Sequence, residues 1–411
     1  EEHDASFKQQ DGLRYHARDV AMVRAKNINI PIVLGTATPS LESWHNATRI
    51  DFKYNFLKLT QRAVKDAQLP EVRTVLVDDK TKHGISRLLV DSINERLERK
   101  EQSLIFINRR GFAPVLFCPL CSWTSECKKC STKLVVHRKT NRLKCHHCGH
   151  DQKMISQCPS CDNLNLRPLG LGTQKIEEVL NSFFPKATIL RVDRDTTRSK
   201  KSLSLLYERM NNRDIDILVG TQMLAKGHDF PFLTLVGVID TDNALYSPDF
   251  RAPEKLFSQL MQVSGRAGRS NIKGEVLIQT AFPNNPVFDG LKKHDYAIFA
   301  RSLLNERKQM NLPPFGFTAI LRVEAKYLKY AEKFINNAAK HAESLSHNVI
   351  VYDPVRPSIE KLKGFERFQL FVQADARADL QQLLREWVVY LREYPLANRV
   401  KWSLDVDPIE F

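Results

Sequence analysis

All eight cysteines of this 411-residue chain lie in one short segment and pair at a single spacing. They form four CxxC motifs, namely Cys118/Cys121, Cys127/Cys130, Cys145/Cys148 and Cys158/Cys161. A CxxC turn can place two thiolates on one tetrahedral Zn²⁺, with Zn–S bonds of about 2.3 Å. Four such turns complete two Cys₄ sites and leave no ligand position open. The spacing therefore predicts two structural Zn²⁺ rather than disulfides or scattered buried thiols.

Spacing alone does not decide which motifs share an ion. We favour a nested pairing because the residues between the inner motifs, Ser131 to Lys144, predict a hairpin that turns near Thr140 and Asn141, as in a zinc ribbon. In this pairing zinc 1 is bound by Cys118, Cys121, Cys158 and Cys161, and zinc 2 by Cys127, Cys130, Cys145 and Cys148. An interleaved cross-brace is the alternative.

The charge of the chain predicts a polyanionic partner. The sequence has 62 Lys and Arg against 47 Asp and Glu, a net charge of +15. The cysteine segment is itself basic and contains Trp123, which suits a nucleic-acid or protein contact surface, or equally a solvated rim around a structural metal. His146 and His147 lie beside a zinc ligand and are expected to be exposed or to support the site rather than to bind the metal.

The sequence has no apolar run of 18 or more residues and no signal peptide at its acidic start, so neither a membrane span nor secretion is predicted. We therefore expect a cytoplasmic protein, in which reduced thiols favour zinc. The length allows two or three domains.

Two groups of motifs flank the cysteine segment. The chain begins with Glu1-Glu2-His3 rather than Met, and an apolar run from Ile30 to Leu34, a predicted strand, leads into Gly35-Thr36-Ala37-Thr38-Pro39. Helix is predicted from Leu13 to Lys26. This order is similar to that of two-lobed RecA-like helicases of superfamily two, in which a DExH box precedes an S/T-A-T motif. The Asp that would precede the box and hold Mg²⁺ is not in the sequence.

The second group follows the cysteines. A predicted strand from Ile215 to Val219 runs into a loop from Gly220 to Phe230, and a helical stretch from Glu254 ends in the signature Gln262-Val-Ser-Gly-Arg266-Ala-Gly-Arg269. Two arginines three residues apart can reach a γ-phosphate across a cleft and stabilise the charge of the transition state.

Together these motifs resemble the PriA family of bacterial replication-restart helicases. The resemblance covers the whole chain, including Asn108 to Phe112, Gly170 to Thr173 and Asp405 to Glu410. Leu13 departs from the family, which often has an aromatic residue there. The family's amino-terminal DNA-binding domain and its Gly-Lys-Thr phosphate loop have no counterpart in the sequence, so the chain is expected to be a C-terminal portion.

The resemblance implies an α/β fold with five parts. Residues 1–62 would be the remnant of RecA-like lobe 1, with the DExH box and the TAT motif, and residues 63–115 the linker and the start of lobe 2. Residues 116–165 would be an inserted two-zinc domain, and residues 166–285 the rest of RecA-like lobe 2. Residues 286–411 would be a C-terminal domain that binds DNA or partners.

The resemblance also implies roles for single residues. Glu1 would orient the attacking water, Glu2 and His3 would connect the ATP site with lobe 2 and DNA, and Thr36 and Thr38 would relay closure between the lobes. Arg266 and Arg269 would be catalytic, with Gly220 and Gln262 contributing to the ATP site. The expected DNA-binding residues are Lys8, Arg14, Tyr15, Arg18, Thr221, Gln222, Lys226, Lys361, Lys363 and Arg367. For the loop from Lys8 to Arg18, an ordinary solvated helix start is the competing interpretation.

The C-terminal residues have a pattern of their own. After a predicted helix from Pro286 to Met310, the order strand (318–323), helix (327–346), strand (349–352), strand (368–373), helix (377–392) and strand (400–406) predicts a ferredoxin-like α+β domain. Arg377 and Gln381 share one helix face and could hold the acidic tail of a single-stranded DNA-binding protein, although a plain solvent-facing helix start fits as well.

The function implied is that of an ATP-dependent 3′-to-5′ DNA helicase, a hydrolase and isomerase of replication restart that uses ATP with Mg²⁺ in the full-length protein. Its partners would be branched and single-stranded DNA, single-stranded DNA-binding protein, other primosome proteins and the replicative helicase loader. Without the phosphate loop, this chain alone would be inactive. The alternative is a non-enzymatic zinc- and DNA-binding fragment. A zinc-ribbon polymerase subunit does not account for the helicase motifs.

Overall fold

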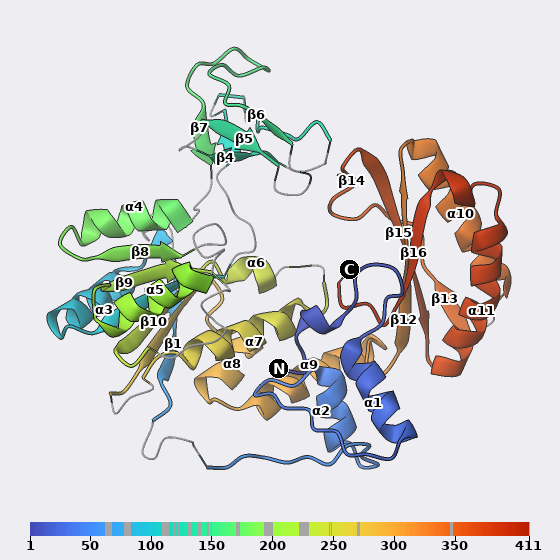
Figure 1. Ribbon diagram of the computed structural model, residues 1–411, viewed down its shortest axis with the longest axis horizontal. Helices are drawn as coiled ribbons and strands as arrows, with labels where there is room; N and C mark the ends of the chain where they lie inside the picture. The colour runs from blue at the N-terminus through green and yellow to red at the C-terminus, as the bar shows by residue number, and fades with distance from the viewer. Residues whose placement is uncertain are drawn as a thin grey trace. The chain divides into compact units, whose positions relative to one another are not determined.

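The computed structural model describes residues 1–61, 68–77, 84–108, 115–118, 120–121, 123–129, 133–137, 141–145, 148, 150–169, 173–192, 200–221, 230–245, 247, 249–268, 272–345 and 348–410. The chain divides into two compact units. Figure 1 labels the helices and strands that build them. Unit 1 comprises Glu1–Tyr54, Val115–Leu169 and Leu303–Phe411, and unit 2 comprises Asn55–Pro114 and Gly170–Ser302. No helix among the described residues is both long and apolar enough to cross a membrane.

Unit 2 is built on a six-stranded parallel sheet. Its strand order is β1 (Glu71–Leu76), β11 (Glu275–Thr280), β10 (Leu233–Ile239), β2 (Gln102–Ile107), β9 (Ile217–Gly220) and β8 (Ile189–Val192). Every residue of β2 and β10 is buried, as expected for central strands of a parallel sheet that is covered on both faces. This burial explains why most residues of both strands are apolar.

Helices of unit 2 follow the strands. They are α3 (Arg87–Glu98), α4 (Thr173–Phe183), α5 (Lys200–Asn211), α6 (Asp242–Leu245), α7 (Ala252–Ser264) and α8 (Pro286–Lys292). Leu89 and Ile93 of α3 form one core with Ile176 and Leu180 of α4 and with Ile105 of β2. These two helices therefore cover the same face of the sheet.

The prediction of a single helix from Pro286 to Met310 is wrong, because the structure has two helices in this range. The first is α8, and the second is α9 (Tyr296–Gln309). The break falls at His294, whose φ is +49°, and the His294 ring is held by the Pro70 carbonyl at 2.7 Å. Asp295 then starts α9 by accepting a hydrogen bond from the Ala297 N–H at 2.8 Å.

The C-terminal part of unit 1 has the predicted element order. Strands β12 (Phe317–Ala325), β13 (Val349–Val351), β15 (Phe365–Ala374) and β16 (Lys401–Val406) form an antiparallel sheet in the order β13-β15-β12-β16. Helices α10 (Leu328–Leu345) and α11 (Arg377–Glu393) pack on one face around Trp387, whose indole N–H donates to the Ala338 carbonyl at 2.9 Å. The short strand β14 (Lys361–Leu362), which pairs with β15, was not predicted.

The cysteine segment of unit 1 is a small antiparallel sheet. Its strands are β3 (Val115–Phe117), β4 (Val135–His137), β5 (Arg142–Lys144), β6 (Asp151–Lys153) and β7 (Arg167–Leu169), in the order β6-β5-β4-β3-β7. The predicted hairpin between the inner CxxC motifs is confirmed, because β4 pairs with β5. Asn141 allows the turn by taking a left-handed φ of +49°.

The first residues of unit 1 form η1 (Ala5–Phe7), α1 (Ala17–Asn27) and α2 (Leu41–Thr48). The helix predicted from Leu13 starts four residues later, because Gln9 N–H donates to the Tyr15 carbonyl at 2.8 Å and closes the preceding residues into a loop. The predicted strand from Ile30 to Leu34 pairs with no strand that the structure describes.

Candidate zinc centres and helicase motifs

The outer CxxC motifs bring their four thiols together. The Sγ atoms of Cys118, Cys121, Cys158 and Cys161 all lie within 4.8 Å of one another. Cys118 and Cys161 are 3.6 Å apart, as are Cys121 and Cys158. Sulfurs on a tetrahedral Zn²⁺ with bonds of about 2.3 Å are about 3.8 Å apart, so the donor set and its geometry fit this ion.

The inner motifs form a second thiol cluster. The Sγ atoms of Cys127, Cys145 and Cys148 lie within 4.8 Å of one another, and Cys127 and Cys148 are 3.6 Å apart. The predicted fourth ligand, Cys130, is outside the described residues. The described thiols thus group outer with outer and inner with inner, which is the nested arrangement and not the cross-brace.

Hydrogen bonds to sulfur favour the thiolate form of one cysteine of the outer cluster, Cys118. Burial alone would raise the pKa of Cys118, but hydrogen bonds from Asn163 and from the N–H groups of Cys121 and Leu120 lower this pKa to about 6. The Asn163 amide donates to the Cys118 sulfur at 3.4 Å. A thiolate is the form that binds zinc. Sequence reasoning missed Asn163, although its place two residues after the last CxxC motif was a usable signal.

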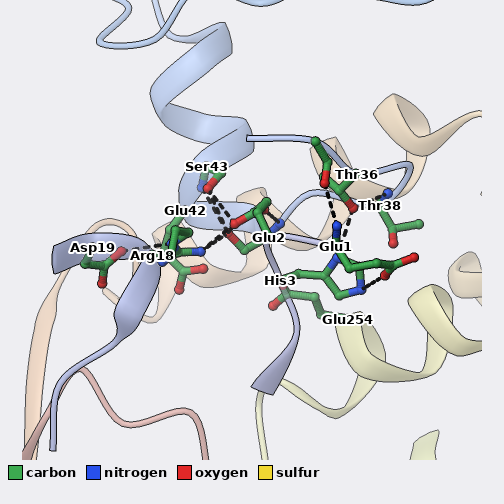
Figure 2. Close-up of polar contacts among 12 residues, drawn as sticks. Glu1, Glu2, His3, Arg18, Asp19, Thr36, Thr38, Glu42, Ser43 and Glu254 are labelled. Atoms are coloured by element: carbon green, nitrogen blue, oxygen red, sulfur yellow. Dashed lines mark hydrogen bonds and ion pairs between the residues drawn. The ribbon is translucent and has the colours of Figure 1, made fainter. Parts of the chain in front are cut away.

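The DExH-like box contacts the TAT segment (Figure 2). His3 Nδ1 lies 3.0 Å from Thr36 Oγ1, and the same hydroxyl accepts a hydrogen bond from the Thr38 N–H at 3.1 Å. On its other side, His3 Nε2 lies 3.2 Å from Glu1 Oε2. A change at either segment can therefore reach the other through the His3 ring.

Glu2 faces the interior instead. Its carboxylate accepts hydrogen bonds from the Ser40 N–H at 2.5 Å, the Ser43 hydroxyl at 3.1 Å and Arg18 Nη1 at 2.7 Å (Figure 2). Ser40 is the N-cap of α2. In this structure Glu2 fixes the box to the start of α2, and its oxygens are used by the protein. Sequence reasoning missed both serines, although a Ser at the start of a helical stretch is a recognisable cap.

The cations of the predicted DNA-sensing loop, Lys8 to Arg18, are not all available to DNA. Lys8 is buried and its ammonium lies 2.8 Å from Asp405. Arg18 is bound by Glu2 and Asp19, and although its burial would lower its pKa, these carboxylates outweigh burial and raise the pKa. Because both cations are paired inside the protein, we no longer assign them to DNA. Arg14 is half-buried and Tyr15 is exposed.

In unit 2, Gly220 ends β9 and Thr221 follows it. Arg266 is buried in the turn just after α7, and Gln262 is half-buried in the last turn of that helix. Burial raises the pKa of Tyr207, and the positive charge of Arg266 acts on the same hydroxyl in the opposite direction. The predicted residues Gln222, Lys226 and Arg269 lie outside the described residues.

Unit 2 also has a cavity of about 230 Å³ that the sequence did not predict. Its lining includes Val77, Ile107 and Asp240, which follow or end strands β1, β2 and β10. The carboxyl ends of parallel strands are a common place for ligands in open α/β sheets.

Basic residues of the C-terminal domain gather at the β14–β15 hairpin. Lys363 is exposed at its tip with a φ of +52°. Lys361 lies 3.1 Å from Glu366, and Arg367 lies 3.1 Å from Glu324, so both cations have acidic partners. These pairs are partly buried, so a phosphate would have to compete with the two carboxylates for Lys361 and Arg367.

The predicted tail-binding residues lie at the start of α11. Arg377 is exposed, with Nη1 3.4 Å from Asp407 and its guanidinium 4.8 Å from the Phe317 ring centre, and Gln381 is half-buried. Leu380, Leu383 and Leu384, expected to form a pocket or the core, belong to the core. Any apolar floor beside Arg377 is therefore the Phe317 ring rather than these leucines.

Known proteins with similar sequences cover nearly the whole chain, and two family models match parts of it. Residues 308–409 match the family described as Primosomal protein N C-terminal domain, and residues 127–153 match the PriA DNA helicase Cys-rich region domain. The chain is 41% identical to the replication restart protein PriA of Haemophilus influenzae over 99% of its own length. It is 39% identical to that of Rickettsia prowazekii and 35% identical to that of Bacillus subtilis.

The chain spans about half to two thirds of these relatives, namely 56%, 63% and 51% of their lengths. Among solved structures it is similar to Dbp5 of Saccharomyces cerevisiae bound to RNA and ADP BeF3, with 14% identity, 71% of this chain and 54% of that chain covered, and a TM-score of 0.32, too low to support an argument. The curated relatives and the two domain matches agree: the chain carries a PriA Cys-rich region and a primosomal protein N C-terminal domain, and over nearly its whole length it is similar to replication restart proteins PriA.

Proposed function

We propose that this chain is part of an ATP-dependent DNA helicase of replication restart, which moves 3′ to 5′, remodels abandoned forks and promotes primosome assembly and loading of the replicative helicase. The observation that carries the proposal is the 41% sequence identity, over 99% of the chain, to a replication restart protein. The contact of His3 with Thr36, at 3.0 Å, supports the proposal. Coupling of ATP hydrolysis to movement requires that a shift of one helicase motif displaces another.

In this proposal unit 2 contains RecA-like lobe 2, and Glu1–Tyr54 belongs to lobe 1. Glu1 orients the water that attacks ATP, while His3, Thr36 and Thr38 transmit the state of the nucleotide. Arg266 and Arg269 stabilise the charge that develops on the γ-phosphate. ATP binds with Mg²⁺ in the full-length protein, with Gly220 and Gln262 near the nucleotide.

The two thiol clusters each hold one structural Zn²⁺ in the nested pairing. Because all four ligand positions of such a site are taken by cysteine, the ion stabilises the fold and performs no chemistry. Fixing the small sheet β3–β7 in this way gives its basic residues a defined surface for DNA or protein.

DNA contacts in this proposal come from three places. Arg14 and Tyr15 offer charge and an exposed ring on the loop that follows η1, and Lys363 with Lys361 and Arg367 offers charge on the β14–β15 hairpin. Thr221, Gln222 and Lys226 follow β9, where backbone amides can meet phosphates.

A protein partner would dock at the start of α11. An acidic tail that ends in a carboxylate, such as that of single-stranded DNA-binding protein, could replace Asp407 as the partner of Arg377, with Phe317 beneath and Gln381 one helical turn away. A labelled acidic peptide should bind Arg377→Ala more weakly than the unmodified protein, and Arg385→Ala, an exposed arginine of the same helix, should bind normally. Equal affinity of all three would remove this site.

The activity itself is tested by ATP hydrolysis. The full-length gene product should hydrolyse ATP faster with single-stranded or forked DNA, and Arg269→Ala should lower turnover by about 10³-fold, as for other arginine fingers. Arg213→Ala, an exposed arginine of unit 2, serves as control and should leave turnover unchanged. Turnover that Arg269→Ala does not reduce would mean that another group neutralises the γ-phosphate.

A further inference from the structure

One buried contact fastens the loop beside the DExH box to the C-terminal sheet. The Lys8 ammonium lies 2.8 Å from Asp405 Oδ1 and donates to the carbonyls of Val406 at 2.8 Å and Asp407 at 3.3 Å. The side chains of Lys8 and Asp405 are only 3% and 5% exposed. The ammonium therefore has two carbonyl acceptors and one carboxylate beside it as an ion pair, so its charge is neutralised inside the protein.

The anchor belongs to the sheet itself. Asp405 lies on β16, and its second oxygen accepts a hydrogen bond from Arg322 Nη1 of the neighbouring strand β12 at 2.9 Å. Arg322 Nη2 also donates to the Glu410 carbonyl at 2.6 Å. Because two strands hold Asp405, a shift of this sheet moves Lys8 with it.

The other end of the contact reaches the helicase motif. Lys8 N–H donates to the Ala5 carbonyl at 3.1 Å and so caps η1, a turn that begins two residues after His3. Lys8 also pairs with His16 in an isolated bridge that closes the base of the exposed loop carrying Tyr15. A displacement of Lys8 would therefore move η1, next to His3 of the helicase box, and also the base of the loop that carries Tyr15.

We propose that Lys8 is a positioning residue through which the C-terminal sheet controls the helicase box: DNA bound on the C-terminal domain changes the alignment of Glu1 and His3 by way of Asp405 and Lys8. The inference rests on the proposed helicase function and adds a route of regulation to it. Buried ion pairs of this kind fix one relative arrangement of the segments they join, because breaking them leaves a charge without a partner.

The test uses Lys8→Met in the full-length gene product. Methionine keeps an unbranched side chain of similar length and removes the ammonium, while Asp405 stays paired with Arg322, so no unpaired carboxylate is created. The ratio of ATP turnover with forked DNA to turnover without DNA should fall by at least about fivefold, within the usual range of coupling between two sites. Lys26→Met removes an exposed lysine of α1 and should leave the ratio unchanged.

A second readout does not depend on activity. In Lys8→Met without DNA, amide hydrogens of residues 9–16 and 405–407 should exchange faster than in the unmodified protein, and those of β2 should not change. Asp405→Asn, which keeps the shape of the site, should change both readouts in the same direction and serves if Lys8→Met does not fold.

The outcomes separate the two claims. If DNA stimulates the unmodified protein and Lys8→Met to the same extent, the coupling is wrong and the helicase function stands. If DNA does not stimulate the unmodified protein, the proposed function fails and the coupling fails with it.

Discussion

Gly268, in the turn after α7, shows how much a single residue of the arginine signature is constrained by its backbone. Its φ is +70°, a conformation that favours glycine, and a Cβ added there would lie 2.3 Å from the Gly274 nitrogen. Glycine is thus required both for the turn and for the close approach of two backbone segments. The same turn carries Arg266, so its shape decides where this arginine lies.

We expect Gly268→Ala to lower the free energy of unfolding of unit 2 by about 3 kcal/mol, the upper end of the usual cost of overpacking, because the substitution adds backbone strain to a steric clash. All four tryptophans, Trp44, Trp123, Trp387 and Trp402, are in unit 1, so unfolding of unit 2 has to be followed by circular dichroism. The matched control is Gly265→Ala in the same turn, where φ is −65° and the nearest atom is 3.5 Å away. Similar stability of both variants would contradict the close approach.

Asp407 gives a prediction about pH. Burial raises the pKa of this carboxyl, and the positive charge of Arg377 opposes the rise. A raised pKa means that the folded state binds the proton more tightly than the unfolded state does. Ionised Asp407 therefore favours folding less than protonated Asp407, and its contribution to stability is lost as pH rises through the folded-state pKa.

Asp407→Asn should consequently raise the urea midpoint of unit 1 at pH 7, by a small amount because 38% of the side chain is exposed. Asn also tolerates the left-handed φ of +50° at this position. Well below the pKa of the unfolded carboxyl the difference should vanish, since both states are then protonated. Tryptophan fluorescence reports this transition, because all four tryptophans, among them Trp402 on β16, are in unit 1. A urea midpoint that falls at pH 7 would show that the pair with Arg377 dominates.

At the scale of elements, the sequence was most informative where one face of a strand or helix is buried. Alternating apolar residues predicted β12 and β16, and the helical period predicted α10 and α11, because these elements pack on a single core around Trp387. The break between α8 and α9 could not be predicted, because it depends on a contact of His294 with Pro70, far away in the sequence.

The same reason explains the candidate site. CxxC spacing is local, so the four thiol pairs could be predicted from the sequence. The predicted hairpin between the inner motifs then favoured the nested grouping that the described thiols adopt. The partners of Lys8 could not be predicted, because Asp405 is almost the whole chain away and nothing local distinguishes a buried lysine from one that binds DNA. The charged and aromatic residues near the helicase motif predicted only that the loop from Lys8 to Arg18 contacts DNA, not which of its cations are paired inside the protein.

The nested thiol groups lead to a prediction at this scale. The purified chain should contain two Zn²⁺, and replacing Cys127 and Cys148 together by Ser should remove one ion, since both thiols serve the same site. Replacing Cys118 and Cys161 together should remove the other ion and leave the inner site filled. Metal analysis after gel filtration measures this. Loss of both ions from either pair would indicate that the motifs are interleaved.

At the scale of the whole molecule, segments far apart in the sequence share one unit. Glu1–Tyr54 is joined to the C-terminal part by the contact of Lys8 with Asp405, by Glu42 and Arg307 at 3.7 Å, and by the rings of His45 and Phe315 at 4.9 Å. The box that would act on ATP is thus held by the domain that would bind DNA and partners. A restart helicase needs such a connection, because hydrolysis is useful only on the correct DNA structure.

The most direct test of the central claim is strand separation by the full-length gene product on model forks. Forks with a single-stranded arm that allows only 3′-to-5′ movement should be unwound when ATP is present, and Glu1→Gln should abolish unwinding while DNA binding persists. Forks of opposite polarity should remain paired. Unwinding that needs no ATP hydrolysis, or that occurs only on forks of opposite polarity, would contradict the account.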